Sequence, residues 1–186
     1  MHKWNDVACK VHSQNQFQCN VPTVNMSHHP TRLGSDHQRV HIVNVYHNTH
    51  LYATDLKDPE CRYLATGKAK SASDTCLNEW RLVPSREGDY YEIIHHHYNE
   101  PLVAAPDSLA YDKDRRTVLT WLLGPSSMHC FWDIKHAPEG HYLIESVEYG
   151  EYLYSVDDPS KGSVFTCRKK DASLNKQFYW DIINIY

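Results

Sequence analysis

The sequence repeats a pattern of apolar residues three times, at a period of 51 residues. The aliphatic members of this pattern are Ile42, Ile93, Ile144, Leu51, Leu102 and Leu153. Each repeat closes on a tryptophan that is followed two places on by an apolar residue, at Trp80, Trp132 and Trp180. A period near 50 residues is typical of repeat architectures, in which several units bury their apolar faces together. The repeat therefore predicts a closed fold of three units, and it favours binding over catalysis.

Each repeat contains four short runs typical of β-strands, separated by Gly, Pro, Asn and Asp residues. Tight turns are expected after each first strand, at Asn48-Thr49, Asn99-Glu100 and Gly150-Glu151. Short strands at this spacing indicate a sandwich or a barrel, and closure also removes exposed strand edges. The sequence therefore predicts an all-β domain over residues 40–186, with units of about 40–89, 90–140 and 141–186. A mostly irregular, polar N-terminal arm is expected over residues 1–39.

Composition narrows the range of partners. The net charge is −4 with neutral histidines, so the chain has no basic footprint for nucleic acid. No apolar stretch approaches the roughly 20 residues that span a bilayer, so no membrane insertion is expected. The segment Met1-His2-Lys3-Trp4 does not begin a signal peptide, which leaves a cytosolic protein or the mature form of a secreted one.

The cysteines favour the secreted form. An even count of six suits an oxidised framework, and no CxxC motif points to zinc or to a redox site. Cys61 and Cys76 flank one predicted hairpin and are the first candidates for a disulfide. The other candidates are Cys9 with Cys19 and Cys130 with Cys167, although six cysteines allow about 15 pairings. A sequon at Asn25 also fits secretion, although a single sequon commonly arises by chance.

Three units of four strands, each with a tryptophan in its last strand, resemble a β-trefoil with pseudo-threefold symmetry. The resemblance covers residues 40–186. The second unit, with the runs 98–102 and 109–121, is similar to repeats of secreted insect trefoil proteins of haemolymph or saliva. The trefoil half of silkworm-type 30-kDa lipoproteins is a more distant likeness, and their helical N-terminal domain is not found in this sequence. The resemblance brings no established active residues.

Ricin-B-type lectins share the trefoil architecture and usually carry a Q-x-W signature in each unit. The corresponding residues here are Asn78, Cys130 and Phe178, so a lectin site of that type is not supported. Acidic residues follow the second strands at Asp107, Asp157 and Asp158, with an aromatic residue at Tyr154. A carboxylate beside an aromatic ring can bind a sugar, although capping a turn is the ordinary role of Asp in such loops.

The densest group of usable side chains is the segment from Tyr111 to Trp121. Asp112, Arg115 and Arg116 lie in it beside Tyr111, and arginines and aromatic residues are the usual anchors of interfaces. These residues are predicted to bind the ligand, against the alternative of a solvated hairpin with compensating charges.

Histidines are abundant, and three are consecutive. Alternation along a strand places His95 and His97 on one face, where two imidazoles could bind zinc or copper. No third ligand is identifiable nearby, so no metal and no other cofactor is expected. His96 aligns with Val45 and Val147 and is expected in or near the core. Protonation of all 14 histidines would take the net charge from −4 to +10, so we expect mild acid to change the protein.

These observations predict a secreted, non-enzymatic protein that binds a glycan or an extracellular protein through its loops. No P-loop, Rossmann fingerprint, nucleophile elbow or HExxH motif supports an enzyme. One alternative is a serine-protease inhibitor of the Kunitz soybean type, with Pro84–Glu87 or Asp114–Thr117 as its reactive loop. The other alternative is a fascin-like intracellular scaffold. The sequence does not determine the oligomeric state.

Overall fold

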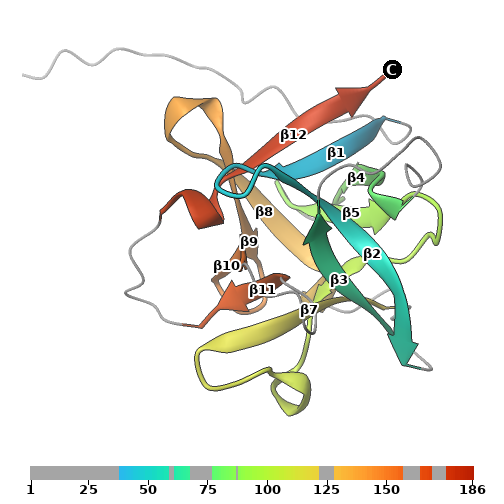
Figure 1. Cartoon of the computed structure of the whole chain (residues 1–186), viewed down its shortest axis with the longest axis vertical. Coiled ribbons are helices and arrows are strands. Elements are labelled where there is room, and N and C mark those ends of the chain that lie inside the picture. The colour runs from blue at the N-terminus through green and yellow to red at the C-terminus, as the bar shows by residue number, and fades with distance from the viewer. Residues whose placement is uncertain are drawn as a thin grey trace, which may run out of the picture. The chain divides into compact units, whose positions relative to one another are not determined.

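The computed structural model describes residues 38–58, 61–67, 77–86, 88–121, 128–156, 164–168 and 175–186 (Figure 1). Residues 55–58, 61–63 and 65–67 are described by their backbone alone. The described ranges contain strands and short 3-10 turns, and no α-helix. The strands are β1 (Arg39–Asn44), β2 (Thr49–Asp58), β3 (Cys61–Gly67), β4 (Trp80–Pro84), β5 (Tyr91–His95), β6 (Leu102–Ala104), β7 (Arg115–Trp121), β8 (Phe131–His136), β9 (Tyr142–Ser146), β10 (Glu151–Ser155), β11 (Val164–Cys167) and β12 (Trp180–Ile185). The 3-10 turns are η2 (Asp107–Leu109), η3 (Met128–Cys130), η4 (Pro138–Gly140) and η5 (Lys176–Phe178).

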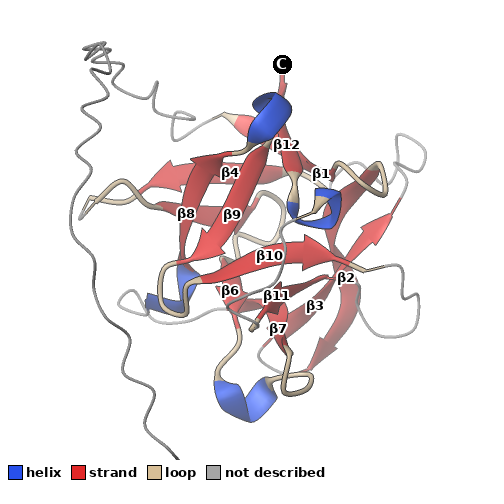
Figure 2. Ribbon diagram, turned by 90° about the vertical axis from the view of Figure 1, so that its left-hand side faces the viewer, coloured by secondary structure: helices blue, strands red, loops and turns tan. Residues whose placement is uncertain are grey.

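The first and last strands of the three units close into a ring. Strand β1 pairs with β4, β4 with β5, β5 with β8, β8 with β9, β9 with β12, and β12 returns to β1. The middle strands form the hairpins β2–β3, β6–β7 and β10–β11, and β7 pairs with both β3 and β11. These hairpins gather at one end of the ring (Figure 2). A barrel with three hairpins is the β-trefoil arrangement, so the predicted fold class is confirmed.

The repeated residues form the core. All nine repeated Ile, Leu and Trp side chains have an exposed fraction of 0%. They belong to one cluster, in which partly buried residues such as Tyr98 and Ile134 pack against the outside. The sequence period therefore reports the residues that the three units bury together.

Each buried tryptophan makes the same hydrogen bond in its own unit. The indole Nε1 of Trp80 donates to the Leu51 carbonyl at 2.9 Å. In the second and third units the corresponding distances are 2.9 Å for Trp132 and 3.1 Å for Trp180, with the carbonyls of Leu102 and Leu153 as acceptors. Because a buried indole N–H needs a partner, this bond joins the last strand of each unit to its second strand.

The turn after each first strand also recurs, as the sequence predicts. Asn48, Asn99 and Gly150 have φ angles of 50°, 54° and 63°. This left-handed conformation is strained for most residues, whereas glycine adopts it freely and asparagine tolerates it. The three positions are one period apart, so the period extends to backbone conformation.

The buried residue that ends the first strand is polar in every unit: Asn44, His95 or Ser146. Asn44 Nδ2 donates to the Gln177 carbonyl at 2.8 Å. His95 Nδ1 accepts from the Tyr98 amide at 3.2 Å, so its proton is on Nε2, which lies 3.0 Å from the carbonyl of Leu77. Asn44 and His95 therefore satisfy backbone groups around the turn and the segment before the tryptophan.

The expectation that His96 lies in or near the core is wrong. Strand β5 ends at His95, and His96 and His97 are exposed in the turn that follows. Alternation applies only inside a strand, and the left-handed Asn99 reverses the chain here. His95 is therefore the buried residue of the three.

We expect Trp132→Phe to lower the free energy of unfolding by about 1–3 kcal/mol, because it leaves the buried Leu102 carbonyl without its donor. The measurement is urea unfolding followed by circular dichroism. Trp121→Phe is the matched control, because Trp121 is only half-buried; its cost should stay below about 1 kcal/mol. Equal losses in the two variants would contradict a special role for the indole bond.

Candidate binding site

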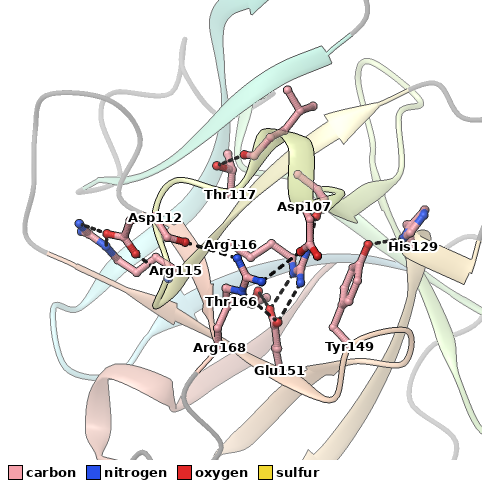
Figure 3. A network of polar contacts seen from close by, with 12 residues as sticks. Asp107, Asp112, Arg115, Arg116, Thr117, His129, Tyr149, Glu151, Thr166 and Arg168 are labelled. Carbon is pink, nitrogen blue, oxygen red and sulfur yellow. Dashed lines mark hydrogen bonds and ion pairs between the residues drawn. The ribbon is translucent and has the colours of Figure 1, made fainter.

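The structure brings together most of the predicted site residues that it describes. Asp107, Tyr111 and Asp112 lie between β6 and β7, and Arg115 and Arg116 begin β7. They meet residues of the third unit from the β9–β10 turn, β10 and β11 (Figure 3). The candidate site therefore lies where the second unit contacts the third.

Arg116 is at the centre of this site and is buried, with an exposed fraction of 2%. Its Nε and Nη2 donate to the two carboxylate oxygens of Glu151 at 2.8 and 3.0 Å. Its Nη1 donates to the Ala105 carbonyl at 2.7 Å, and its Cζ lies 3.4 Å from the ring centroid of Tyr149. Arg116 was predicted to bind a ligand, and in the structure its guanidinium is occupied by partners inside the protein.

Glu151 makes this burial of charge possible. It is itself 9% exposed, and its Oε2 also accepts from Thr166 Oγ1 at 2.6 Å. Burial alone would lower the pKa of Arg116, but the hydrogen bonds and the charge of Glu151 outweigh it and raise that pKa above its usual value. Arg116 therefore stays charged, and its pairing with Glu151 joins β7 to β10.

Asp107 is the exposed member of the network. Its side chain is 72% exposed, and its Oδ1 lies 2.9 Å from Arg116 Nη1 and 3.2 Å from Arg168 Nη2. Within the described part of the chain, its other oxygen, Oδ2, has no hydrogen-bond donor. One carboxylate oxygen is thus fixed by two arginines, and the other can accept hydrogen bonds from solvent or a ligand.

Asp112 has a structural role in the same loop. Its Oδ1 accepts from the backbone amides of Asp114 and Arg115 at 2.9 and 2.8 Å, and its Oδ2 accepts from Arg115 Nε at 2.8 Å. The hydrogen bond from Arg115 lowers the pKa of Asp112. Asp112 therefore caps the turn and pairs with Arg115, a charge compensation of the kind that the sequence offered as the alternative for this segment.

Tyr111 presents an aromatic surface beside this turn. It is 44% exposed, and its ring centroid lies 5.0 Å from that of Phe165. The guanidinium carbon of Arg115 lies 4.3 Å from the Tyr111 ring centroid. Arg115 is thus held between Asp112 and Tyr111, and it supports the ring rather than projecting into solvent.

Tyr154, also predicted to bind the ligand, is 9% exposed and lies inside a second apolar cluster. Its ring stacks on that of Phe178 with the centroids 5.0 Å apart, and burial raises the pKa of its hydroxyl. The aromatic surface of the site therefore comes from Tyr111. Asp157 and Asp158 lie outside the described residues.

Sequence reasoning missed Glu151, Thr166 and Arg168. A signal existed for the first two, because Glu100 and Thr120 occur at the matching places of the second unit. Thr120 Oγ1 donates to Glu100 Oε2 at 2.7 Å, as Thr166 does to Glu151. Nothing in the sequence pattern singled out Arg168.

The other predicted sites are tested only in part. The described residues contain no group of three or more His, Cys, Asp or Glu side chains placed to hold a metal ion. Both ring nitrogens of His95 have backbone partners, and His97 is exposed in the turn after β5. No helix in the described ranges is long and apolar enough to cross a membrane.

Cys130 and Cys167 do not form a disulfide with each other. Cys130 Sγ lies 3.7 Å from Glu92 Oε1, and burial with this neighbouring carboxylate raises the pKa of the Cys130 thiol to about 11. The remaining cysteine candidates, Cys9, Cys19, Cys76 and the side chain of Cys61, lie outside the described residues, as does Asn25.

Neither candidate inhibitor loop is an extended, projecting segment. Arg115–Thr117 pairs with Phe165–Cys167 inside the sheet, so it cannot enter a protease cleft. Arg86 is exposed, but it lies in a short turn closed by a hydrogen bond of 2.8 Å from the Ser85 amide to the Tyr90 carbonyl. This geometry favours the connecting-turn interpretation of both segments.

We expect Arg116→Met to lower the free energy of unfolding by about 3–5 kcal/mol, because it leaves the Glu151 carboxylate buried without its partner. The double variant Arg116→Met/Glu151→Leu should recover most of that loss. Arg115→Met, which breaks a half-exposed pair, is the matched control and should cost about 1 kcal/mol or less. Urea unfolding measures all three variants, and no recovery in the double variant would contradict the assignment.

No family model matches the chain, and no curated protein matches it either. Solved structures do match. The designed threefold-symmetric protein ThreeFoil has a TM-score of 0.64 at 16% identity, covering 79% of this chain and 99% of its own. A Culex quinquefasciatus salivary protein of the cysteine- and tryptophan-rich family has a TM-score of 0.58 at 24% identity, covering 80% of this chain and 93% of its own.

A Polyporus squamosus lectin, solved with a sialylated influenza-binding epitope, has a TM-score of 0.59 at 19% identity, covering 80% of this chain and 49% of its own. At such identities the likeness concerns the fold and not the ligand. With the closed ring, the three hairpins and the repeated tryptophan bond, it identifies the chain as a β-trefoil protein similar in fold to insect salivary proteins and lectins.

Proposed function

We propose that this β-trefoil is a non-enzymatic, secreted protein that binds a neutral glycan at the loop formed by residues 107–115. The observation that carries the proposal is the Asp107 carboxylate, with one oxygen held by Arg116 and Arg168 and the other exposed. Such a fixed acceptor suits the hydroxyl groups of a sugar, because its orientation costs nothing at the moment of binding.

The charges of the site favour a neutral ligand. The three carboxylates of Asp107, Asp112 and Glu151 are paired with three guanidinium groups, which belong to Arg115, Arg116 and Arg168. No arginine in this set is left over to bind an anionic group such as a sialic acid. An uncharged ligand with hydroxyl groups can bind without an unpaired charged side chain in the site.

The apolar contacts fit the same class of ligand. Leu109 and Tyr111 are each 44% exposed on the same loop. A half-exposed tyrosine ring can stack on the apolar face of a pyranose, while a carboxylate accepts from its hydroxyls.

The loop is also rigid, which lowers the entropic cost of binding. Thr117 Oγ1 donates to the Leu109 carbonyl at 2.8 Å, and the Arg115 carbonyl accepts from the amides of Tyr111 and Asp112 at 3.1 and 3.2 Å. The Arg168 amide donates to the Asp114 carbonyl at 2.9 Å and joins the loop to the third unit.

Secretion and the absence of catalysis rest on separate support. The even number of cysteines and the sequon suit an extracellular protein, and the matched Culex proteins are salivary. The Asp107, Asp112, Arg115 and Arg116 side chains are paired in ways that fix structure, and the pKa of Asp112 is lowered, which does not suit a general acid.

We expect wild-type protein to bind neutral glycans on an array, and Asp107→Ala to weaken that binding about 10–100-fold through loss of a charged acceptor. Tyr111→Ala should weaken it as well. Glu139→Gln is the matched control, because Glu139 is an exposed carboxylate on η4, away from this loop. It should bind as wild type does.

Three results would contradict the proposal. Selective binding to sialylated or sulfated glycans would show that the charge argument is wrong. A silent array, combined with inhibition of a trypsin-family protease that is lost in Arg86→Ala, would instead indicate the inhibitor alternative. Silence in both assays, with a protein partner captured through Leu109 and Tyr111, would make the loop a protein-binding site.

A further inference from the structure

In each unit, a residue of the first strand pairs with the residue two places before the tryptophan, outside the tryptophan core. The chemistry of this pair differs among the three units. In the second unit these residues are Glu92 and Cys130, which lie in contact. In the third they are Leu143 and Phe178, which belong to one apolar cluster. Neither pair contains a histidine, and burial raises the pKa of the Cys130 thiol.

In the first unit the corresponding residues are His41 and Asn78, joined by His50 of β2. The rings of His41 and His50 meet edge to face, with centroids 4.9 Å apart. Asn78 is 7% exposed, and its Nδ2 lies 3.3 Å from His50 Nδ1. Because the amide nitrogen is a donor, His50 Nδ1 accepts and its ring is neutral. We call these three residues the histidine cluster.

Two buried atoms of the histidine cluster have no hydrogen-bond partner among the described residues: His41 Nε2 and Asn78 Oδ1. Four of the five such atoms belong to the first unit, the others being His47 Nε2, Thr49 Oγ1 and Ser146 Oγ. A buried polar atom without a partner costs about 1–3 kcal/mol. The net stabilising free energy of the histidine cluster is therefore small even when both rings are neutral.

The surrounding charges give little help to a protonated ring. The charge of Glu79 favours protonated His41, but Glu79 Oε2 already pairs with Arg39 Nη1 at 2.9 Å. Across the strands, Asp181 of β12 lies opposite Val43, and its Oδ1 is 2.6 Å from His141 Nδ1. From β3, the residue opposite His50 is a glycine. Glu79 and Asp181 are therefore both engaged by other side chains.

The histidine cluster holds the segment that leads into β4, residues 77–79. The contact between Asn78 and His50 is one bond of this segment. In addition, its Glu79 carbonyl accepts a hydrogen bond from the His96 amide at 2.8 Å. The Leu77 carbonyl lies 3.0 Å from His95 Nε2. Protonation of His50 Nδ1 would turn it from acceptor to donor against the Asn78 amide, and protonation of His41 as well would place two cations in contact.

We propose that the histidine cluster is an acid-sensitive contact: it holds residues 77–79 on β1 and β2 at neutral pH and releases them in mild acid. The segment leads into β4, so its release loosens the first unit while the tryptophan core stays intact. The proposal does not depend on glycan binding, because the candidate site lies on the other two units.

The direction of the pH effect follows from the pKa values. Burial lowers the pKa of both histidines below the ordinary 6.5; the neighbouring His41 lowers that of His50 further, and Glu79 partly opposes the effect at His41. The released state therefore binds protons more readily than the closed state. The stabilising contribution is complete above about pH 6.5 and is lost as the pH falls below it.

Hydrogen exchange tests the proposal site by site. We expect the protection factor of the His96 amide, whose acceptor is Glu79, to fall about tenfold or more from pH 7.5 to 5.5, since each pKa unit corresponds to a factor of ten. Protection of the Trp80 indole N–H should change much less. His50→Gln keeps an acceptor for Asn78 but cannot titrate, so it should remove most of the fall. His97→Gln, at an exposed histidine, should behave as wild type.

Asn78→Asp supplies the converse test, because a carboxylate favours protonated His50 and should raise its pKa in an NMR titration. Unchanged protection of His96 across the pH range in wild type would overturn the proposal. An equal fall in wild type and His50→Gln would do the same. If His50→Gln does not fold, an NMR titration of the wild-type protein tests the proposal instead. A pKa of His41 or His50 at or above 6.5 would contradict the proposed acid-sensitive contact.

Discussion

The hydrogen bond from a buried indole to a leucine carbonyl is the constraint on which this trefoil depends. Tryptophan brings the largest apolar surface of any residue, but its N–H requires an acceptor once it is buried. The carbonyls of Leu51, Leu102 and Leu153 supply that acceptor from the second strand of each unit. Each bond fixes a hairpin to a strand of the barrel, so three local contacts set the relation between the two layers of the fold.

With the core defined by repeated residues, the units are free to differ elsewhere. The second unit places Arg116 beneath an exposed loop, and the third supplies Glu151 to neutralise it. The first unit carries histidines where its counterparts carry a carboxylate with a thiol or two apolar side chains. Chemistry that could recognise a ligand or respond to pH is therefore found at positions that do not repeat.

The strength of the sequence period explains which features could be predicted. Buried side chains and the left-handed turns at Asn48, Asn99 and Gly150 recur because each unit meets the same packing and backbone requirements. Arg116 was predicted to bind a ligand because arginines and aromatic residues are the usual anchors of interfaces, and its burial was not foreseen. Alternation held the missing information, since Arg116 shares its face of β7 with the buried Val118 and Thr120. No such signal marked Arg168, which follows a strand of another unit and reaches Asp107 only in the folded chain.

The same alignment bears on how many ligands one molecule can hold. Counting five residues on from the repeated leucines gives Leu56, Asp107 and Asp158. Counting back two from the third-strand residues Leu64, Val118 and Val164 gives Arg62, Arg116 and Gly162. Only the second unit combines an aspartate with an arginine at these two places, and an exposed carboxylate needs that arginine to be fixed in direction. The Asp–Arg combination thus occurs in one of the three units, although the fold is threefold. If the proposed glycan site depends on it, one molecule has one such site and lacks the gain in avidity that repeated sites provide.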